Sequence, residues 1–440
     1  MAISTSANAK RSLGFLFGLS SLMVGANLVW VSYNTILLPT LVEHVITTSK
    51  GLVVGLIGFF GTLLSIFVTL LWGIISDHSS NRWGKRTPSI LMGALLAFPL
   101  IGLPALIYSP AWREVFFPMA MPIIILSYFG MQFFTNVSNG AWWPLLVDMV
   151  PENQRGMAAG IGGFLTLVGA AMGILVVTQL NQHGQTGNAL LLIGGGFTLT
   201  GLINAMVIRG VDRPARISEH ISVWGAMRDM FRVRKVVEVF FWLVIAMLLA
   251  NMGFNSLQFF ARYFFEVYFP AISPDAGYRM MGGVSLVVMM LSAVGAGILS
   301  DKIGRRTMIL WAMIACAIST LVMGFTSNFG LFLFFTGLRS VALGPILSTA
   351  PALASDLAPK EEAGHYMAYN NISTSLSGAL SSLVFGVLLA QLTRTTFEYL
   401  FILSAILFLL GALVFSKRVT QDAVEERLQA DLEEISELTG

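Results

Sequence analysis

The residues with the clearest chemical potential lie in two short charged segments of an otherwise apolar chain. Residues 76–86 read SDHSSNRWGKR, and residues 300–306 read SDKIGRR. In both, an aspartate follows a glycine by four positions and precedes a glycine with two basic residues: Gly73-x-x-x-Asp77 with Gly84-Lys85-Arg86, and Gly297-x-x-x-Asp301 with Gly304-Arg305-Arg306. Glycine lets a neighbouring helix approach closely, and a carboxylate can bind basic groups or the N–H groups of a helix N-terminus. The pattern predicts ionic contacts within the protein rather than catalysis.

A second pair of motifs repeats in the same order. Asp148-x-x-Pro151-x-x-x-x-Gly156 follows the first charged segment, and Asp356-x-x-Pro359-x-x-x-x-Gly364 follows the second. Two independent motifs in register predict a chain built from two repeated halves.

Amide and aromatic side chains interrupt several apolar runs at helical spacing. One stripe is Gln132, Asn136, Asn139 and Trp143, and another is Asn251, Asn255, Gln258 and Arg262, each at i, i+4, i+7 and i+11. Such spacing places each set on one helix face. Amides both donate and accept hydrogen bonds, and aromatic rings cover the C–H face of a sugar, so the stripes favour a wet cavity for a polyhydroxylated ligand. Hydrogen bonding between helices is the alternative.

Further candidates for substrate binding lie on other apolar runs. They are Asn27, Trp30 and Asn34 near the N-terminus, Arg339 inside a later run, and Tyr366 with Asn370, which share a face with Ser373 and Ser377. A guanidinium inside a membrane is costly, so we expect Arg339 to meet the solute, a backbone carbonyl, water or a distant acid. Glu266, one turn beyond Arg262, is the candidate for coupling to protons.

The elements that must position these residues are membrane-spanning helices. The chain is 55% hydrophobic and 11% charged, with a mean hydropathy of +0.77. Twelve apolar runs occur, and their backbones must form helices because lipid offers no hydrogen bonds. They cover 12–39, 51–76, 88–109, 117–147, 156–181, 188–208, 236–268, 278–300, 307–326, 329–355, 365–391 and 397–416. We therefore predict an all-α membrane protein with twelve transmembrane helices in two pseudo-symmetric six-helix bundles.

Basic residues predict the orientation of these helices. Counted by alternate loops, 20 Lys and Arg residues fall on the side of the N-terminus and 4 on the other. The positive-inside rule then places both termini in the cytoplasm of a multi-pass protein of the cell (inner) membrane. The predicted organisation is one bundle over 1–209, a cytoplasmic linker over 210–235, a second bundle over 236–416 and an acidic amphipathic tail over 417–440.

The paired loops and the layout of six plus six helices resemble the major facilitator superfamily. Within it, SDHSSNRWGKRTP and PLLVDMVPENQRG look like the branch of sucrose-type and glycoside–pentoside–hexuronide cation symporters. The resemblance implies a central cavity lined by helices 1, 4, 7 and 10. It also implies that Asp77 and Asp301, with Arg86 and Arg305 or Arg306 reaching Asp148 and Asp356, hold the halves together on the inside.

These observations favour a secondary transporter for a sugar, glycoside or sugar acid, working by alternating access and coupled to protons. No acid lies between Lys50 and Ser76, which disfavours a sodium site of the melibiose type and leaves uncoupled facilitation open. An exporter of amphiphilic drugs is the alternative within transport, and a non-transporting sensor or assembly factor is an alternative of another class. No phosphate-binding loop, metal-spaced cluster or hydrolase elbow occurs, so neither an enzyme nor a cofactor is expected. The expected partners are the solute, protons and membrane lipid, with no nucleic acid, and the expected state is a monomer.

Overall fold

Helices make up the secondary structure of the described chain, as expected from its apolar runs. The computed structural model describes residues 10–214, 237–358 and 363–420. In this part of the chain twelve helical stretches are long and apolar enough to cross a membrane, and each coincides with a predicted run. They are Leu13–Val45, Lys50–Asp77, Thr87–Tyr108, Arg113–Trp142, Asn153–Gln182, Thr186–Ile208, Glu238–Asn255, Pro274–Ala293, Arg305–Phe325, Phe329–Leu357, Tyr369–Leu388 and Arg394–Arg418. The predicted fold class is confirmed.

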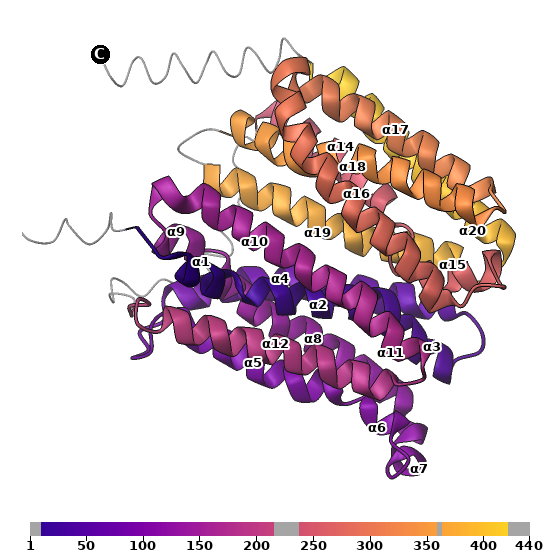
Figure 1. Ribbon diagram of the computed structural model, residues 1–440, viewed down its shortest axis with the longest axis horizontal. Helices are drawn as coiled ribbons and strands as arrows, with labels where there is room; N and C mark the ends of the chain where they lie inside the picture. The colour runs from indigo at the N-terminus through magenta and orange to yellow at the C-terminus, as the bar shows by residue number, and fades with distance from the viewer. Residues whose placement is uncertain (1–9, 215–236, 359–362, 421–440) are drawn as a thin grey trace, which may run out of the picture. The chain divides into compact units, whose positions relative to one another are not determined.

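The first unit of the chain contains residues 1–47 and 60–231. Its helices, including the last part of α4, are α1 (Leu13–Ser20), α2 (Leu22–Ser32), the π-helical turn η1 (Tyr33–Leu37), α3 (Leu38–Val45), α4 (Lys50–Asp77), α5 (Thr87–Gly102), α6 (Ala105–Tyr108), α7 (Arg113–Phe116), the 3₁₀ turn η2 (Phe117–Met119), α8 (Ala120–Trp142), α9 (Leu145–Met149), α10 (Glu152–Met172), the π-helical turn η3 (Gly173–Val177), α11 (Thr178–Gln182) and α12 (Thr186–Ile208). Within this unit α5 packs against α8 and α12, and α2 packs against α10 and α12 (Figure 1).

Buried polar contacts join three helices of the first unit at one point. The indole Nε1 of Trp142 donates to the carbonyl of Leu19 at 2.7 Å, and the amide of Asn204 donates to the same carbonyl. One carbonyl of α1 therefore binds both α8 and α12. Such shared bonds stabilise helix packing in lipid, where apolar contact alone gives little preference.

The second unit contains residues 48–59 and 232–440. Besides the start of α4, its helices are α14 (Glu238–Asn255), α15 (Ala261–Tyr268), α16 (Pro274–Ile303), α17 (Arg305–Phe325), α18 (Phe329–Leu357), α19 (Ala363–Leu388) and α20 (Arg394–Arg418). Here α18 packs against α16 and α17, and α20 packs against α14 and α17 (Figure 1). The boundaries predicted for the two bundles stay a prediction, and most of the predicted linker and tail lies outside the described residues.

The predicted run 236–268 is broken rather than continuous. α14 ends at Asn255, and α15 begins at Ala261 after a turn closed by a hydrogen bond of 3.1 Å from the Gln258 amide to the Asn255 carbonyl. Ser256 contributes to the break, since its hydroxyl donates to the Gly253 carbonyl at 2.9 Å. Serine and asparagine offer the backbone such local alternatives to helical bonds. The prediction that Gln258 and Arg262 continue the face of Asn251 and Asn255 is therefore wrong.

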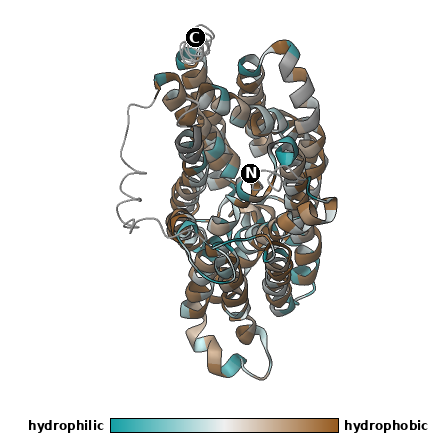
Figure 2. Ribbon diagram, turned by 90° about the vertical axis from the view of Figure 1, so that its left-hand side faces the viewer, coloured by the Kyte–Doolittle hydropathy of each residue, from teal (hydrophilic) through white to brown (hydrophobic). Residues whose placement is uncertain are grey.

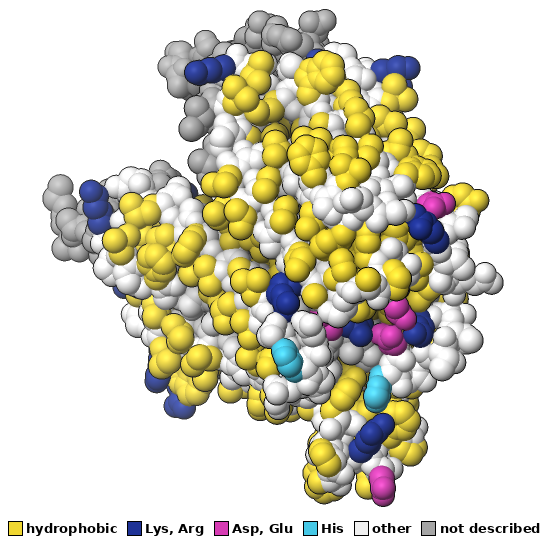
Figure 3. Space-filling view, turned by 45° about the vertical axis from the view of Figure 1, so that its right-hand side comes forward, with side chains coloured by type: hydrophobic (Ala, Val, Ile, Leu, Met, Phe, Trp, Pro, Cys, Tyr) yellow, Lys and Arg dark blue, Asp and Glu magenta, His cyan; other side chains and the backbone are white. Residues whose placement is uncertain are grey.

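The surface matches an environment of lipid. Hydrophobic residues predominate along the helices in Figure 2, and hydrophobic side chains cover wide areas of the face drawn in Figure 3. Large apolar side chains are exposed on spans of both units, including Phe60, Trp311 and Phe334. Contiguous apolar surface of this kind is unfavourable in water and ordinary in a bilayer.

Candidate functional site

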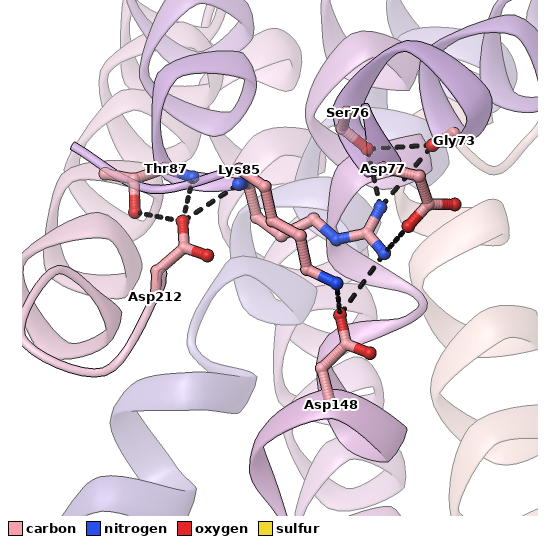
Figure 4. A network of polar contacts seen from close by, with 8 residues as sticks. Gly73, Ser76, Asp77, Lys85, Thr87, Asp148 and Asp212 are labelled. Carbon is pink, nitrogen blue, oxygen red and sulfur yellow. Dashed lines mark hydrogen bonds and ion pairs between the residues drawn. The ribbon is translucent and has the colours of Figure 1, made fainter. Parts of the chain in front are cut away.

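A charged cluster in the first unit includes Asp77, Lys85 and Asp148 (Figure 4), and its central residue is Arg86. Its side chain is 1% exposed, and its guanidinium pairs with Asp77 and, at 3.2 Å, with Asp148. The same group donates to the hydroxyl of Ser76 at 2.6 Å and to the carbonyl of Gly73 at 3.4 Å. A buried guanidinium needs such partners, because an unpaired charge away from water is strongly destabilising.

Lys85 adds a second cation to this cluster, with its Nζ 2.8 Å from Asp148. The loop before α5 thus brings two adjacent basic residues to one carboxylate that follows α8. The resemblance to the superfamily implied this meeting of Arg86 with Asp148. All the residues of this cluster belong to the first unit, and their role in gating stays a prediction.

Asp212 is a member of the same region that the sequence motifs did not reveal. Its Oδ2 accepts three hydrogen bonds of 2.8 Å, from the backbone amides of Arg86 and Thr87 and from the Thr87 hydroxyl. These amides lie at the start of α5, where backbone N–H groups have no partner within the helix and where a negative charge is favourable. Asp212 lies four positions after the last residue of α12, so its hydrogen bonds join the end of α12 to the beginning of α5.

The backbone of the loop before α5 is shaped for this contact. Gly84 has a φ of +108°, and a Cβ at this position would collide with the Asp212 carboxylate. Arg209, at the end of α12, lies over the indole of Trp83 with its Cζ 5.6 Å from the ring centroid. Two side chains from the end of α12 therefore hold the loop that carries Arg86.

The second unit has a smaller version of the charged cluster. Arg305 pairs with Asp356, and Arg306 donates to the carbonyl of Ser416 at 3.0 Å and to that of Val419. The side chain of Asp301 and the surroundings of Gly297 lie outside the described part of the structure. Of the two basic residues, Arg305 is the one that meets the motif carboxylate, and Arg306 binds the end of α20.

Two of the predicted binding amides in the first unit are buried in a network between helices. Asn34, in the π-helical turn η1, accepts from the Tyr128 hydroxyl at 2.7 Å and donates to the Trp30 carbonyl at 2.8 Å. Gln132 donates to the Tyr128 hydroxyl at 3.3 Å. The bond between Tyr128 and Asn34 joins α8 to the first span and is of the interhelical kind that was the alternative to a binding role, whereas the other two bonds lie within one span.

Other predicted residues of the first unit remain accessible. Asn27 and Asn136 are half-buried, and Asn136 accepts from the Thr69 hydroxyl at 2.9 Å. Asn139 is also half-buried, and its Oδ1 has no hydrogen-bond partner within the described chain. Trp30 and Trp143 are exposed, although Trp143 follows the end of α8 rather than extending it.

The predicted residues of the second unit divide in the same way. Asn251, Asn255 and Asn370 are half-buried, and the Asn255 amide lies 3.5 Å from the hydroxyl of Ser377. Gln258 is half-buried in the turn after α14. Tyr366 is buried, since its hydroxyl accepts from the Val237 amide at 3.1 Å and its ring packs on Phe240.

Arg262 pairs with a carboxylate outside its own helix. Its Nη1 lies 3.0 Å from Asp275 at the start of α16. Glu266 is exposed on α15 and forms no ion pair with a described residue. The proposed role of Glu266 in coupling stays a prediction.

Arg339 lies within α18, in the middle of a predicted span. Its Cζ is 5.7 Å from the ring centroid of Phe254 on α14, and its backbone carbonyl is near the thiol of Cys316 on α17. The side chain is half-buried, but its Nη1 is buried and has no hydrogen-bond partner within the described chain.

Twelve apolar spans that carry charged clusters at their ends and amides within them define a multi-pass membrane transporter for small solutes. The chain belongs to the Major Facilitator Superfamily, which matches residues 12–296 and 256–438. The superfamily consists of transporters and not of enzymes.

The relatives named by comparison move different solutes. The chain is 22% identical over 324 residues to a "Multi-drug resistance efflux pump PmrA homolog" of Lactococcus lactis subsp. lactis, which covers 66% of this chain and 76% of that protein. It is 23% identical over 145 residues to the "Gentisate transporter" of Corynebacterium glutamicum, only 32% of either chain. Among solved structures it is similar to a D-xylose-proton symporter, with a TM-score of 0.68 at 15% identity over 93% of this chain and 98% of that one. At this sequence identity, the structural similarity shows that the two proteins share a fold and does not show a shared solute.

Proposed function

We propose that this transporter moves a sugar, glycoside or sugar acid by alternating access, together with protons. The protein is then a carrier of the cell membrane with both termini in the cytoplasm, related to the sucrose-type and glycoside–pentoside–hexuronide symporters. The sequence runs around Trp83 and Pro151 support this branch.

One observation carries the proposal: amides within the spans are accessible rather than enclosed. Asn27 and Asn136 in the first unit, and Asn251, Asn255 and Asn370 in the second, are all half-buried. Each bond within the protein, such as that of Asn136 with Thr69, satisfies only part of an amide, and the accessible part is favourable next to water and costly next to hydrocarbon. Amides together with Trp30 suit a ligand with many hydroxyl groups.

Protons are the coupling ion that the residues support best. The apolar part of α4 carries no carboxylate for a cation, whereas Glu266 on α15 is exposed and has no ion pair with a described residue. A carboxyl group in this position can take up and release a proton during the transport cycle.

Export of amphiphilic compounds by proton antiport is the second candidate. The similarity to the efflux pump favours it, because that match covers 66% of this chain. The fifth span, which contains α10 and η3, weakens the export proposal. In the drug/proton antiporters of this superfamily that span carries a glycine-rich run with Gly-Pro, whereas here it is rich in glycine but contains no proline.

Transport by the purified protein in liposomes tests the proposal. We expect labelled sugars or sugar acids to enter in response to an inward proton gradient, and Asn136→Ala with Asn251→Ala to slow this entry. Asn188→Ala, at an exposed amide of α12, is the matched control and should transport normally. If only cationic dyes move, and in the direction opposite to protons, the export function replaces the proposed one.

A further inference from the structure

The buried polar atoms that lack partners in the described part of the second unit lie on two helices that pack against each other. Among its described residues they are Ser319 Oγ, Thr320 Oγ1 and Arg339 Nη1. Ser319 and Thr320 lie on α17, which packs along α18, the helix of Arg339. In most proteins such groups have partners, so three of them together require an explanation.

The three groups lie at the same level of the packed helices. Cys316 of α17 contacts the carbonyl of Arg339, and Met323 of α17 contacts Thr336, one turn before Arg339 on α18. Ser319 and Thr320 fall between these two contacts. All three unpartnered groups can donate hydrogen bonds, and one of them is a permanent cation.

The described residues around Arg339 do not neutralise its charge. The core against which Phe254 packs is apolar and includes Met247, Ala250 and Met313. The Phe254 ring offers a cation–π contact, but such a contact is weaker than the penalty for burying part of a charged group without a counter-ion.

We propose that Arg339 binds a carboxylate of the transported solute, with Ser319 and Thr320 as further donors at the same level. This inference rests on the proposed function and narrows the solute to an organic acid, such as a sugar acid. A carboxylate is planar and can accept two parallel bonds from one guanidinium. A single guanidinium balances its one negative charge, whereas a phosphate carries between one and two.

A neutral sugar fits this place less well. Hydroxyl groups would satisfy the hydrogen bonds of the guanidinium but would leave its charge without a counter-ion. The half-buried amides of the second unit, Asn251, Asn255 and Asn370, can still bind the hydroxyl groups of a sugar acid, so Arg339 and the amides have separate tasks.

Matched pairs of probes test the inference on the unaltered protein. D-glucuronate with D-glucose, and D-galacturonate with D-galactose, differ only in whether carbon 6 carries a carboxylate. We expect the acid of at least one pair to stabilise the purified protein against heat and to enter liposomes, with the neutral sugar at least tenfold weaker. D-glucose 6-phosphate, the third arm, should compete poorly.

Variants then test Arg339 itself. Arg339→Gln should weaken binding of the acid about ten- to a hundredfold, the usual effect of losing hydrogen bonds to a charged group. Arg339→Lys should recover only part of it, because an ammonium cannot donate two parallel bonds. Arg394→Gln is the matched control: Arg394 also lies over a ring, that of Tyr268, but has a carboxylate partner in Glu398 at 3.5 Å.

The possible results separate this inference from the proposed function. Binding of neutral sugars without their acids, or unchanged acid binding by Arg339→Gln, overturns the inference and leaves sugar transport standing. If no sugar and no acid binds or enters, both fail. If Arg339→Gln does not fold, the comparison within each pair of probes still decides, because it uses the unaltered protein.

Discussion

The backbone amide of Arg86 donates a hydrogen bond of 2.8 Å to Oδ2 of Asp212, a residue 126 positions later in the chain. The same oxygen accepts from the amide and hydroxyl of Thr87. Because Arg86 also places its guanidinium between Asp77 and Asp148, this carboxylate holds the backbone from which the charged cluster is built. Asp212 is therefore a positioning residue for the cluster. It lies four positions after α12, which ends at Ile208.

The charge of Asp212 should therefore matter as much as its shape. Asp212→Asn keeps the size but replaces a carboxylate that accepts three bonds. We expect the free energy of unfolding to fall by about 1.5 to 3 kcal/mol, the range for hydrogen bonds to a charged group, and the midpoint of thermal unfolding in detergent to fall with it. Thr87→Val removes one of the three bonds and should lower the midpoint less. A midpoint for Asp212→Asn equal to that of the unaltered protein would contradict this account.

The two glycines that repeat between the halves should respond differently to alanine. Both have positive φ, +108° at Gly84 and +83° at Gly304, so both substitutions introduce backbone strain. Only at Gly84 would the new Cβ meet the Asp212 carboxylate, since nothing lies within 4 Å of that position at Gly304. We expect Gly84→Ala to unfold at a clearly lower temperature than Gly304→Ala in parallel melting experiments. Equal losses would mean that strain alone explains both.

The twelve spans could be predicted because hydropathy and helical length are local properties of the sequence. The contact of Arg86 with Asp148 could be predicted, because the repeated motif resembles that of the superfamily and the resemblance implies this contact. Asp212 could not, because nothing near it in the sequence indicates that it meets a loop 126 residues earlier. The stripe through Gln258 failed for a related reason: helical spacing assumes an unbroken helix, and the turn after Asn255 depends on local bonds of Ser256 and Gly253. The missing partner of Arg339 is a property of its packed surroundings, which a pattern of residue types does not contain.

Removal of the charge of Asp77 tests the predicted gating role of the charged cluster, which is to hold the two halves together on the inside. Asp77→Asn removes one of the two carboxylates that pair with Arg86 and leaves Asp148 in place. Because Asp77 is half-exposed, we expect the lost ion pair to change the free energy by an amount of order 1 kcal/mol. We expect a population shifted toward the inward-open state and slower uptake into liposomes. Asp301→Asn should act in the same direction. Unchanged uptake by both variants and by their combination would remove the gate assignment.

Cysteine labelling tests the orientation that the basic residues predict. In a Cys316→Ser background, single cysteines at Gly184 and Asn328 should react with a membrane-impermeant maleimide added to intact cells. Cysteines at Ser80 and Ser218 should react only after the membrane is opened. The reverse pattern would place both termini outside.

Glu266 offers the sharpest test of proton coupling. It is exposed on α15, while Arg262, one turn earlier, pairs with Asp275 at 3.0 Å, so the substitution Glu266→Gln leaves that ion pair intact. Glutamine keeps the size of the side chain but cannot bind and release a proton. We expect Glu266→Gln to lose accumulation driven by a proton gradient while it still exchanges labelled for unlabelled solute across the liposome membrane, because exchange requires no net proton movement. Glu398→Gln, which alters a carboxylate paired with Arg394 at 3.5 Å, should retain both activities. If Glu266→Gln accumulates solute as the unaltered protein does, the proton binds elsewhere or transport is uncoupled; if exchange is lost as well, the residue serves binding or folding rather than coupling.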